Sequence, residues 1–351
     1  MPVSVDLSLI EGPYLTDLLD QPQALQRAVD GLEQSVALQK FARSLSRGDY
    51  QRAVLTGMGS SLHSLYPLYL ALTEFGLPSQ MVETAELALY MRRVLDERTL
   101  LIAVSQSGRS AETIRLLGLT AGRVPTIGVT NTPDSPLAAQ SDAIVLMHAG
   151  QETTVSCKTY LTTLVALEWL SAVLRGADLA KTRAELQQAA PAATAYLARW
   201  RSHVESLLAT LEGAKHIFVT GRGASLAAAE SGGLTLKESA HFATEGMSAA
   251  AFRHGPFEML GPHVFVVVFE GDGVSSALNR RLAEDIVAAG GRSVLVGEGA
   301  ADEVFRLPCV ASAVRPVVEI LPVQMMSLAL AAINGHHAGR FDRATKITTI
   351  E

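Results

Sequence analysis

The chain has 351 residues, a length typical of about two domains of ordinary size. Hydrophobic residues make up 48% and charged residues 18%, a balance that supports well-buried cores and excludes a disordered chain. The formal net charge of -6 disfavours nucleic acid or an acidic membrane surface as a general partner, so any recognition of an anion must be local.

Cysteine content and the chain start indicate the compartment. Two cysteines, Cys157 and Cys309, are too few for a disulfide framework. No CxxC motif or Cys/His cluster suggests a metal site, so we expect no metal and no cofactor. The first residues lack a basic segment followed by an apolar run, and no stretch of about 18 uncharged apolar residues is present. We therefore expect a cytoplasmic protein without a membrane partner.

Two segments of the chain carry the same pattern. Residues 51–61 (QRAVLTGMGSS) and residues 215–225 (KHIFVTGRGAS) each consist of an apolar run followed by T-G-x-G-x-S. A second apolar run ends 48 residues after Gly57, at Ser105, and the second half repeats that spacing from Gly221. An internal duplication is the economical interpretation.

Helical patterns lie between the apolar runs, at residues 60–74, 110–121 and 226–241. Strands that alternate with helices form βαβ units and a parallel sheet with helices on both faces. We therefore predict an α/β protein with two tandem flavodoxin-like domains. The segment 178–212, rich in Ala, Leu and charges, is predicted to be a helical connector containing the domain boundary, with Pro191 starting or kinking a helix.

The first half carries a polar loop where ligands bind in such a sheet, beyond the carboxyl end of a strand and at the start of a helix. The loop is SQSGRSAET (residues 105–113), with the helix starting near Ala111. Its hydroxyls and backbone N–H groups form an anion cradle, helped by the helix dipole. Gly108 lets the backbone turn tightly against a phosphate. An ordinary serine-rich helix cap is the alternative explanation.

The turn after the first strand, residues 57–61, is the second part of this predicted site. It lacks the full GxGxxG pattern and a convincing acidic ribose partner about 20 residues later, so a dinucleotide is not expected. The matching second-half loop, residues 270–273, is Glu-Gly-Asp-Gly, whose carboxylates repel phosphate. The sequence thus predicts one phosphate cradle, in the first half.

Candidate acid–base residues lie mainly in the second half. Glu238, His241 and Glu245 have spacings that put all three on one helical face, and His254 precedes a Gly-Pro pair that ends regular structure. A satisfied structural pair is the alternative for His241 and Glu245. A solvated surface position is the alternative for Glu238 and His254. Lys346, near the end of the chain, by itself has the pattern of a solvated tail charge.

Together these motifs resemble the SIS (sugar isomerase) domain family, in particular the isomerase half of glucosamine-6-phosphate synthase. SQSGRSAET resembles the family's SQSGETADT phosphate loop, and QETTVSCKTYLTTL resembles its E-x-x-VAS-TK segment with one residue deleted. The stretch from Gly221 to Pro256, the opening LLDQPQAL and the closing segment 320–351 resemble further family motifs in the right order. The resemblance covers residues 15–351.

The resemblance implies a role for each matching residue. Glu238 matches the general base that acts between C1 and C2, His254 the ring-opening histidine supplied across a homodimer, and Lys346 the tail lysine that closes over the site and forms an imine. The phosphate ligands that it implies are Ser61, Ser105, Gln106, Ser107 and Ser110. The residues that it implies near the sugar are Gly59, Ser60, Glu152 and Val155.

A domain organisation is also implied. It consists of tandem SIS domains at residues 35–178 and 213–340, with a helical connector at residues 179–212. A helical segment precedes them at residues 1–34, and the tail 341–351 closes over the active site.

Three departures from the synthase narrow the predicted activity. Pro2 follows Met1 where an amidotransferase presents an N-terminal cysteine, and no glutaminase domain is expected, so glutamine should not be the nitrogen source within this chain. Thr235 stands where the synthase has a lysine near the base, which predicts different proton handling. Arg109 replaces an acidic residue in the phosphate loop.

We therefore predict a phosphosugar isomerase that acts on a hexose or aminosugar 6-phosphate and couples isomerisation to deamination, as in glucosamine-6-phosphate deaminase. The alternatives are a fructosamine-6-phosphate deglycase, a galactosamine-phosphate isomerase/deaminase and a non-catalytic sugar-phosphate sensor. The last is disfavoured because the three matching catalytic residues are retained together. A dehydrogenase is disfavoured by the missing fingerprint.

Overall fold

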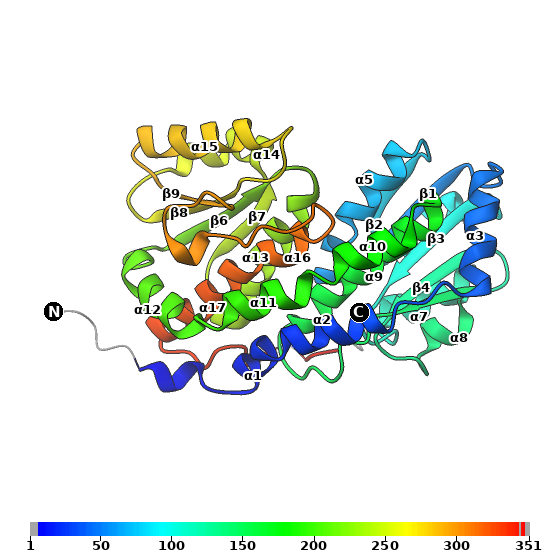
Figure 1. The fold of residues 1–351 in the computed structure, drawn as a ribbon, viewed down its shortest axis with the longest axis horizontal. Coiled ribbons are helices and arrows are strands. Elements are labelled where there is room, and N and C mark those ends of the chain that lie inside the picture. Colours follow the sequence, from blue (N-terminus) through cyan, green and yellow to red (C-terminus); the bar gives the residue numbers. More distant parts are fainter. Residues whose placement is uncertain (1–5, 344, 348–351) are drawn as a thin grey trace. The chain divides into compact units, whose positions relative to one another are not determined.

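The chain divides into two compact units in the computed structural model, which describes residues 6–343 and 345–347. We call them the first-sheet unit (residues 23–151, 158–187 and 345–347) and the second-sheet unit (residues 6–22, 152–157 and 188–343). Each contains one parallel sheet with helices on both faces (Figure 1). The α/β fold predicted from the alternating pattern is confirmed.

The first-sheet unit holds a five-stranded sheet in the order β2-β1-β3-β4-β5, the flavodoxin-like order. Its strands are β1 (Arg52–Gly57), β2 (Ser79–Glu83), β3 (Thr99–Val104), β4 (Thr126–Thr130) and β5 (Ala143–Leu146). Strand β1 pairs in parallel with both β2 and β3, so the strand order reverses between β1 and β3. Ligands bind at such a switch point in α/β sheets.

Helices cover both faces of this sheet. They are α2 (Gln21–Asp30), α3 (Val36–Ser46), α4 (Ser60–His63), α5 (Tyr66–Glu74), α6 (Thr84–Tyr90), α7 (Ala111–Thr120), α8 (Pro136–Gln140), α9 (Lys158–Arg175) and α10 (Leu179–Leu186), with a 3-10 turn at Arg92–Val94. On one face, leucines of α6, α7 and α8 pack against Val54, Leu101 and Ala103. Helix α9 packs against β4 and β5 and contacts α3 and α5.

The helix predicted over residues 60–74 is interrupted. Helix α4 ends at His63, and α5 begins at Tyr66 with Pro67 in its first turn. A proline inside a helix has no N–H to donate, and its ring clashes with the carbonyl four residues earlier. The first turn of a new helix tolerates proline, so the chain breaks before it.

The second-sheet unit repeats the arrangement with four strands in the order β7-β6-β8-β9. They are β6 (His216–Gly221), β7 (Thr244–Ser248), β8 (Val264–Phe269) and β9 (Arg292–Val296). This order matches β2-β1-β3-β4 of the first sheet, and Gly57 and Gly221 each end the corresponding strand. The duplication seen in the sequence therefore extends to topology.

Helices enclose this second sheet as well. They are α1 (Pro13–Leu19), α11 (Ala189–Leu197), α12 (Trp200–Thr210), α13 (Leu226–Ala240), α14 (Ala249–Arg253), α15 (Ser276–Ala288), α16 (Arg315–Glu319) and α17 (Leu321–Ile333), with 3-10 turns at Leu7–Ile10, Gly223–Ser225, Pro256–Met259 and Glu303–Phe305. Phe252 of α14 and Leu282 of α15 pack on Phe218 of β6. Side chains alternate along a strand, so the neighbouring Val219 faces α13 and α17.

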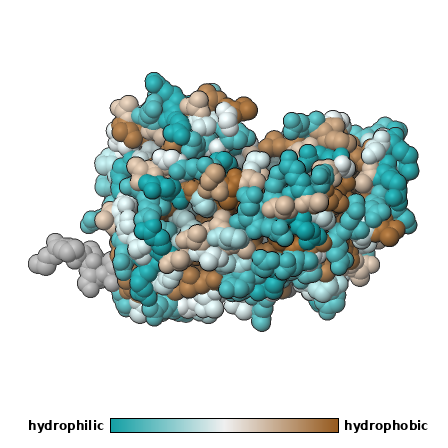
Figure 2. All heavy atoms as spheres, viewed as in Figure 1, coloured by the Kyte–Doolittle hydropathy of each residue, from teal (hydrophilic) through white to brown (hydrophobic). Residues whose placement is uncertain are grey.

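The segment Arg315–Ile333 is long and apolar enough to cross a membrane by length and composition. Nevertheless, 94% of the most apolar stretch of this segment is buried inside the protein. The core helix of a compact domain has the same composition. The face drawn in Figure 2 is covered mostly by hydrophilic residues, with hydrophobic ones between them.

Helix α13 crosses β7 at very short range. A Cβ on Gly233 would lie 2.4 Å from the backbone nitrogen of Gly246. A Cβ on Gly246 would lie 2.3 Å from the carbonyl oxygen of Ala229. Neither backbone can withdraw without opening the core, so both positions require glycine.

We predict that Gly233→Ala lowers the free energy of unfolding by about 1–3 kcal/mol, because the added methyl group overpacks this crossing. Urea unfolding followed by circular dichroism measures the change. Gly118→Ala in α7 is the matched control, because no atom lies within 4 Å of its added Cβ. That substitution should stabilise the protein by about 0.5–1 kcal/mol through helix propensity. Equal effects of the two substitutions would contradict the close crossing.

Candidate functional site

Two polar turns meet at the carboxyl edge of the first sheet. Strand β1 ends at Gly57 and β3 ends at Val104, and the two strands are paired neighbours. The turn 57–61 and the loop 105–110 follow these strand ends directly. The tertiary structure thus brings the two predicted parts of the phosphate site to one edge, at the switch point of the sheet.

The loop after β3 is a tight, internally bonded turn. Ser105 and Ser107 are buried, at 9% and 8% exposure. The Ser105 Oγ accepts the N–H of Gly108 at 3.1 Å, and the Ser107 Oγ accepts the N–H of Arg109 at 3.2 Å. A hydroxyl that accepts one hydrogen bond still has a proton to donate. Both side chains can therefore hold the loop and donate to an anion.

The loop ends on a helix cap. Ser110 caps α7 by accepting the N–H of Thr113 at 3.3 Å, which confirms the predicted helix start at Ala111. The helix N-terminus attracts negative charge. Gly108 has a φ of 61°, in the left-handed region, and a Cβ there would lie 2.3 Å from the Ser135 Oγ. The turn therefore requires glycine.

Backbone bonds fix the loop to the next strand. The carbonyl of Gln106 accepts the N–H of Asn131 at 3.0 Å and the hydroxyl of Thr130 at 3.2 Å. The Arg109 guanidinium donates to the backbone carbonyl of Asp134 at 3.2 Å and lies 3.4 Å from the Asp134 carboxylate. Because this ion pair is exposed, it contributes little to stability.

The turn after β1 completes this edge of the sheet. Gly59 has a φ of 53° and precedes α4, whose first two residues are Ser60 and Ser61. A Cβ on Gly57 would lie 2.9 Å from the backbone of Ser61 and of Leu62. Both serine side chains are half-buried.

The predicted general base, Glu238, lies in the second-sheet unit. It is half-buried on α13. Tyr14 lies close enough that the Glu238 charge affects its ionisation. Burial raises the pKa of Tyr14 far above its usual range, and the charges of Cys157 and Glu238 raise it further. Tyr14 is fully buried, and its hydroxyl pairs with the Ser327 hydroxyl at 3.0 Å. Glu238 thus has an uncharged phenol as a neighbour.

Glu152 and Val155 belong to the same unit. Glu152 is 7% exposed, and its Oε1 accepts the N–H of Cys157 at 2.9 Å. Val155 is buried in the same segment. His254 ends α14 and is exposed. Lys346 is half-buried and belongs to the first-sheet unit, as do the predicted phosphate ligands.

The expectation that Glu238, His241 and Glu245 share a helical face is wrong. Helix α13 ends at Ala240, and His241 has a left-handed conformation with a φ of 50° that terminates it. Glu245 lies on strand β7. The His241 Nδ1 lies 3.8 Å from a carboxylate oxygen of Asp342. Of the three residues, Glu238 alone lies on α13.

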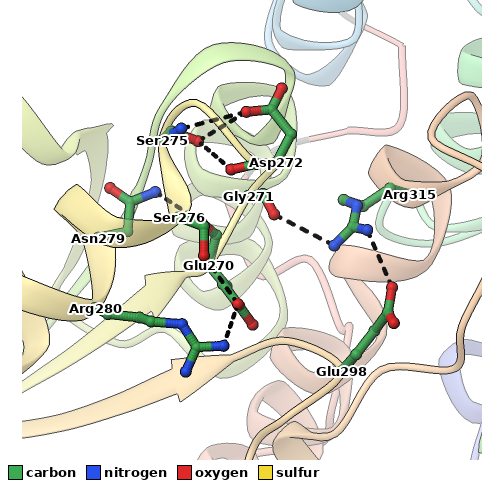
Figure 3. Close-up of polar contacts among 9 residues, drawn as sticks. All are labelled: Glu270, Gly271, Asp272, Ser275, Ser276, Asn279, Arg280, Glu298 and Arg315. Carbon is green, nitrogen blue, oxygen red and sulfur yellow. Dashed lines mark hydrogen bonds and ion pairs between the residues drawn. The ribbon is translucent and has the colours of Figure 1, made fainter.

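The second-half loop is closed by its own side chains (Figure 3). Glu270 accepts a hydrogen bond from Ser276 at 3.0 Å and pairs with Arg280. Asp272 accepts the hydroxyl of Ser275 at 3.2 Å. The carboxylates at this edge are therefore engaged within the loop and the following helix.

Arg315 approaches the same loop from α16 (Figure 3). It donates to the Gly271 carbonyl at 3.3 Å and to the Glu298 carboxylate at 3.0 Å. Glu319, also on α16, is 1% exposed, and its Oε1 accepts the Ser225 hydroxyl at 2.8 Å. Burial raises the pKa of Glu319 to about 7, although the Ser225 hydrogen bond and Arg315 oppose that shift.

Sequence analysis missed Tyr14 and Glu319. Tyr14 lies on the short helix α1 and Glu319 on the short helix α16, and neither belongs to a motif. Their importance depends on distant partners, because Tyr14 and Ser327 are 313 residues apart in the chain. The only signal that marks these two residues is that an ionisable side chain is buried, and burial cannot be read from the sequence alone.

Comparison with known proteins identifies the family. The SIS domain family matches residues 49–172 and 210–334, together more than half of the chain. The chain therefore belongs to the SIS domain family, with one SIS domain in each half. This confirms the family resemblance and the tandem-domain fold.

Individual relatives agree with this assignment. Glutamine–fructose-6-phosphate aminotransferase (isomerizing) of Pyrococcus horikoshii is 29% identical over 348 residues, which cover 96% of this chain and 57% of that protein. The chain thus spans little more than half the length of that relative.

Two solved structures share the fold. The C-terminal domain of glucosamine-fructose-6-phosphate aminotransferase from Francisella tularensis has a TM-score of 0.81 at 21% identity, covering 97% of this chain and 98% of that one. Glucosamine-6-phosphate deaminase from Thermotoga maritima has a TM-score of 0.78 at 18% identity, covering 97% of this chain and 100% of that one.

We predict that Glu319→Gln stabilises the protein above pH 7 but not near pH 4.5. A carboxyl whose folded pKa is raised to about 7 favours unfolding as pH rises, because the unfolded carboxyl ionises first. The penalty is absent below the ordinary pKa and complete above pH 7, where a shift of this size amounts to about 3 kcal/mol at most. Glutamine removes the charge and still accepts the Ser225 hydroxyl.

Urea unfolding at pH 4.5, 6 and 8 measures this difference. Glu205→Gln, at an exposed position of α12, is the control and should show no such trend. A difference between Glu319→Gln and the parent chain that stays constant from pH 4.5 to 8 would rule out the raised pKa.

Proposed function

We propose that this chain is a phosphosugar isomerase that acts on a hexose or aminosugar 6-phosphate and couples aldose–ketose isomerisation to the release of ammonia. The loop 105–110 carries the proposal, because buried hydroxyls, a left-handed glycine and a helix start converge at the sheet's switch point. Membership of the SIS domain family supports it, as do relatives named as an isomerizing aminotransferase and a deaminase.

The first-sheet unit would hold the phosphate. The proposed ligands are Ser61, Ser105, Gln106, Ser107 and Ser110. Hydroxyls, backbone N–H groups and a helix N-terminus can together bind a phosphate dianion without a cationic side chain. Binding the phosphate away from the reacting carbons fixes the position of C1 and C2.

Glu238 would be the base that moves a proton between C1 and C2. Transfer of a carbonyl between these carbons through an enediol needs one base beside both. Tyr14 is held neutral by burial, so it adds no second negative charge that would repel the ionised base. Thr235 is buried one turn before Glu238, at the position where the synthase has a lysine. The proposed base therefore has a neutral neighbour here in place of a cationic one. Gly59, Ser60, Glu152 and Val155 would shape the sugar pocket.

His254 and Lys346 would complete the site. An imidazole titrates near neutral pH and can move a proton between the ring oxygen and the anomeric hydroxyl. His254 is exposed at the end of α14, so it can reach a second copy of the chain, and we propose a cytoplasmic homodimer with shared sites. Lys346 would form an imine with the open ketose. Borohydride should then trap an adduct at Lys346. Failure to trap an adduct on the parent chain, together with substantial turnover by Lys346→Ala, would refute the imine.

The function is tested with a panel of phosphorylated sugars. Purified protein should release ammonia and a ketose phosphate from glucosamine 6-phosphate or galactosamine 6-phosphate without added glutamine. The same sugars without phosphate should react far more slowly. Release of an amine from fructosamine 6-phosphate alone would identify a deglycase. Binding of these sugars without any turnover would identify a sensor.

We predict that Glu238→Gln lowers kcat about 10²–10⁴-fold, the usual contribution of general-base catalysis. KM should change little, because the phosphate loop is untouched. Solvent deuterium exchange at C1 or C2 gives an independent measure of the base. The control is Glu245→Gln, at an exposed position on β7, which should exchange at the parent rate. Deuterium exchange by Glu238→Gln at the parent rate would contradict the assignment of Glu238 as the base.

The shared-site proposal is tested in mixed dimers. Glu238→Ala and His254→Ala chains, each inactive alone, should recover part of the activity when their subunits exchange. Absence of recovery despite demonstrated subunit exchange would place both residues in one chain's site.

A further inference from the structure

The segment that follows α17, residues 334–343, is fastened to the end of α13 within the second-sheet unit. Gly339 is the only buried residue of this segment. Its N–H donates to the Ser239 carbonyl at 2.9 Å, and the N–H of Ala338 donates to the Leu9 carbonyl at 3.0 Å. Two successive backbone bonds thus attach the segment to α13 on one side and to the chain before α1 on the other.

The bond to Ser239 caps a helix. Helix α13 ends at Ala240, and its last carbonyls have no partner inside the helix. The Ser239 carbonyl is one of these, and the Gly339 N–H supplies its partner from a distant part of the chain. Glu238 lies in the same last turn, directly before Ser239. The segment 334–343 therefore holds the helical turn that carries the proposed base.

This attachment requires glycine at position 339. Gly339 has a φ of 72°, in the left-handed region, and a Cβ there would lie 2.5 Å from the Cβ and 2.6 Å from the Cγ of Tyr14. Tyr14 is fully buried, and its hydroxyl pairs with the Ser327 hydroxyl at 3.0 Å. The two contacted atoms are the end of that side chain nearest its backbone, so they cannot withdraw. A side chain at position 339 would therefore push the segment away from Tyr14 and from Ser239.

Side chains on either side of Gly339 also lie against the end of α13. His241, the residue that terminates this helix, has its ring centroid 5.0 Å from that of His336. The His241 Nδ1 lies 3.8 Å from a carboxylate oxygen of Asp342. His336 precedes Gly339 in the chain and Asp342 follows it. The segment thus follows the end of α13 on both sides of the capping bond.

We propose that Gly339 is a positioning residue for Glu238, which it holds beside the reacting carbons by capping the last turn of α13. This inference rests on the proposed function. Gly339 acts through the helix and does not itself meet the substrate. Without the cap the last turn frays, and a misplacement of about 1 Å can cost about 10²-fold in rate. The segment also leads directly to the tail that carries Lys346, so the position of the base depends on the attachment of the tail.

Gly339→Ala tests this role, and Gly335→Ala is its matched control. Gly335 has a φ of 70°, but no described atom lies within 4 Å of its added Cβ. Both variants therefore have the same left-handed strain, and only the first displaces the segment. Gly339→Ala should lower kcat about 10–100-fold, and Gly335→Ala should keep the parent kcat. KM should stay nearly constant in both, at a temperature where circular dichroism shows each variant to be folded.

A double variant separates positioning of the base from general damage. Gly339→Ala should slow solvent deuterium exchange at C1 or C2 in the parent chain. In the Glu238→Gln chain the same substitution should cause no further loss, because the base that it misplaces is already absent. Losses that multiply in the double variant would show that Gly339 acts elsewhere and would overturn the proposal.

Amide hydrogen exchange of the full chain tests the cap without any turnover. The amides of residues 237–242 should exchange faster in Gly339→Ala than in the parent and in Gly335→Ala. An active parent with unchanged protection of these amides in Gly339→Ala would overturn the positioning role alone, as would equal losses of kcat in the two alanine variants. A parent chain that turns over no phosphosugar would instead refute the proposed function, and this role with it, before any variant is compared.

Discussion

Gly108 has a left-handed φ of 61° at a point where a Cβ would come within 2.3 Å of the Ser135 hydroxyl oxygen. This turn reverses the chain between β3 and α7, so that Ser105 and Ser107 accept N–H groups from within the loop. Any residue with a side chain here would push the loop away from Ser135 and Leu137, at the start of α8. The candidate phosphate site depends on this constraint, because hydroxyls and helix dipole must point at one volume.

The two halves show how one scaffold supports different chemistry. Their strand orders correspond, and each has a polar turn at the ends of its first and second core strands. In the first half these turns carry hydroxyls and a capped helix. In the second half Glu270 and Asp272 accept hydrogen bonds from their own loop and helix. The fold is thus common to both halves, and the side chains at the strand ends decide which edge can accept a phosphate.

The second-sheet unit also buries several ionisable groups in uncharged form. Burial raises the pKa values of Tyr14 and Glu319 and lowers that of His203. In each case burial is the largest cause of the shift, because removal from water disfavours the charged form. Tyr14 and Glu319 have hydroxyl partners, whereas neither ring nitrogen of His203 has a hydrogen-bond partner among the described residues.

The sequence by itself determined the α/β class, the duplication and the position of the serine loop. These follow from local features: apolar runs, helical periodicity, and the spacing of glycines and serines along the chain. The tertiary structure decided what depends on contacts between distant residues. It ended α13 at Ala240 and put Glu245 on a strand, and it buried Tyr14 against Ser327. Local propensity could not separate these outcomes, because burial and long-range hydrogen bonds leave no periodic trace in a sequence.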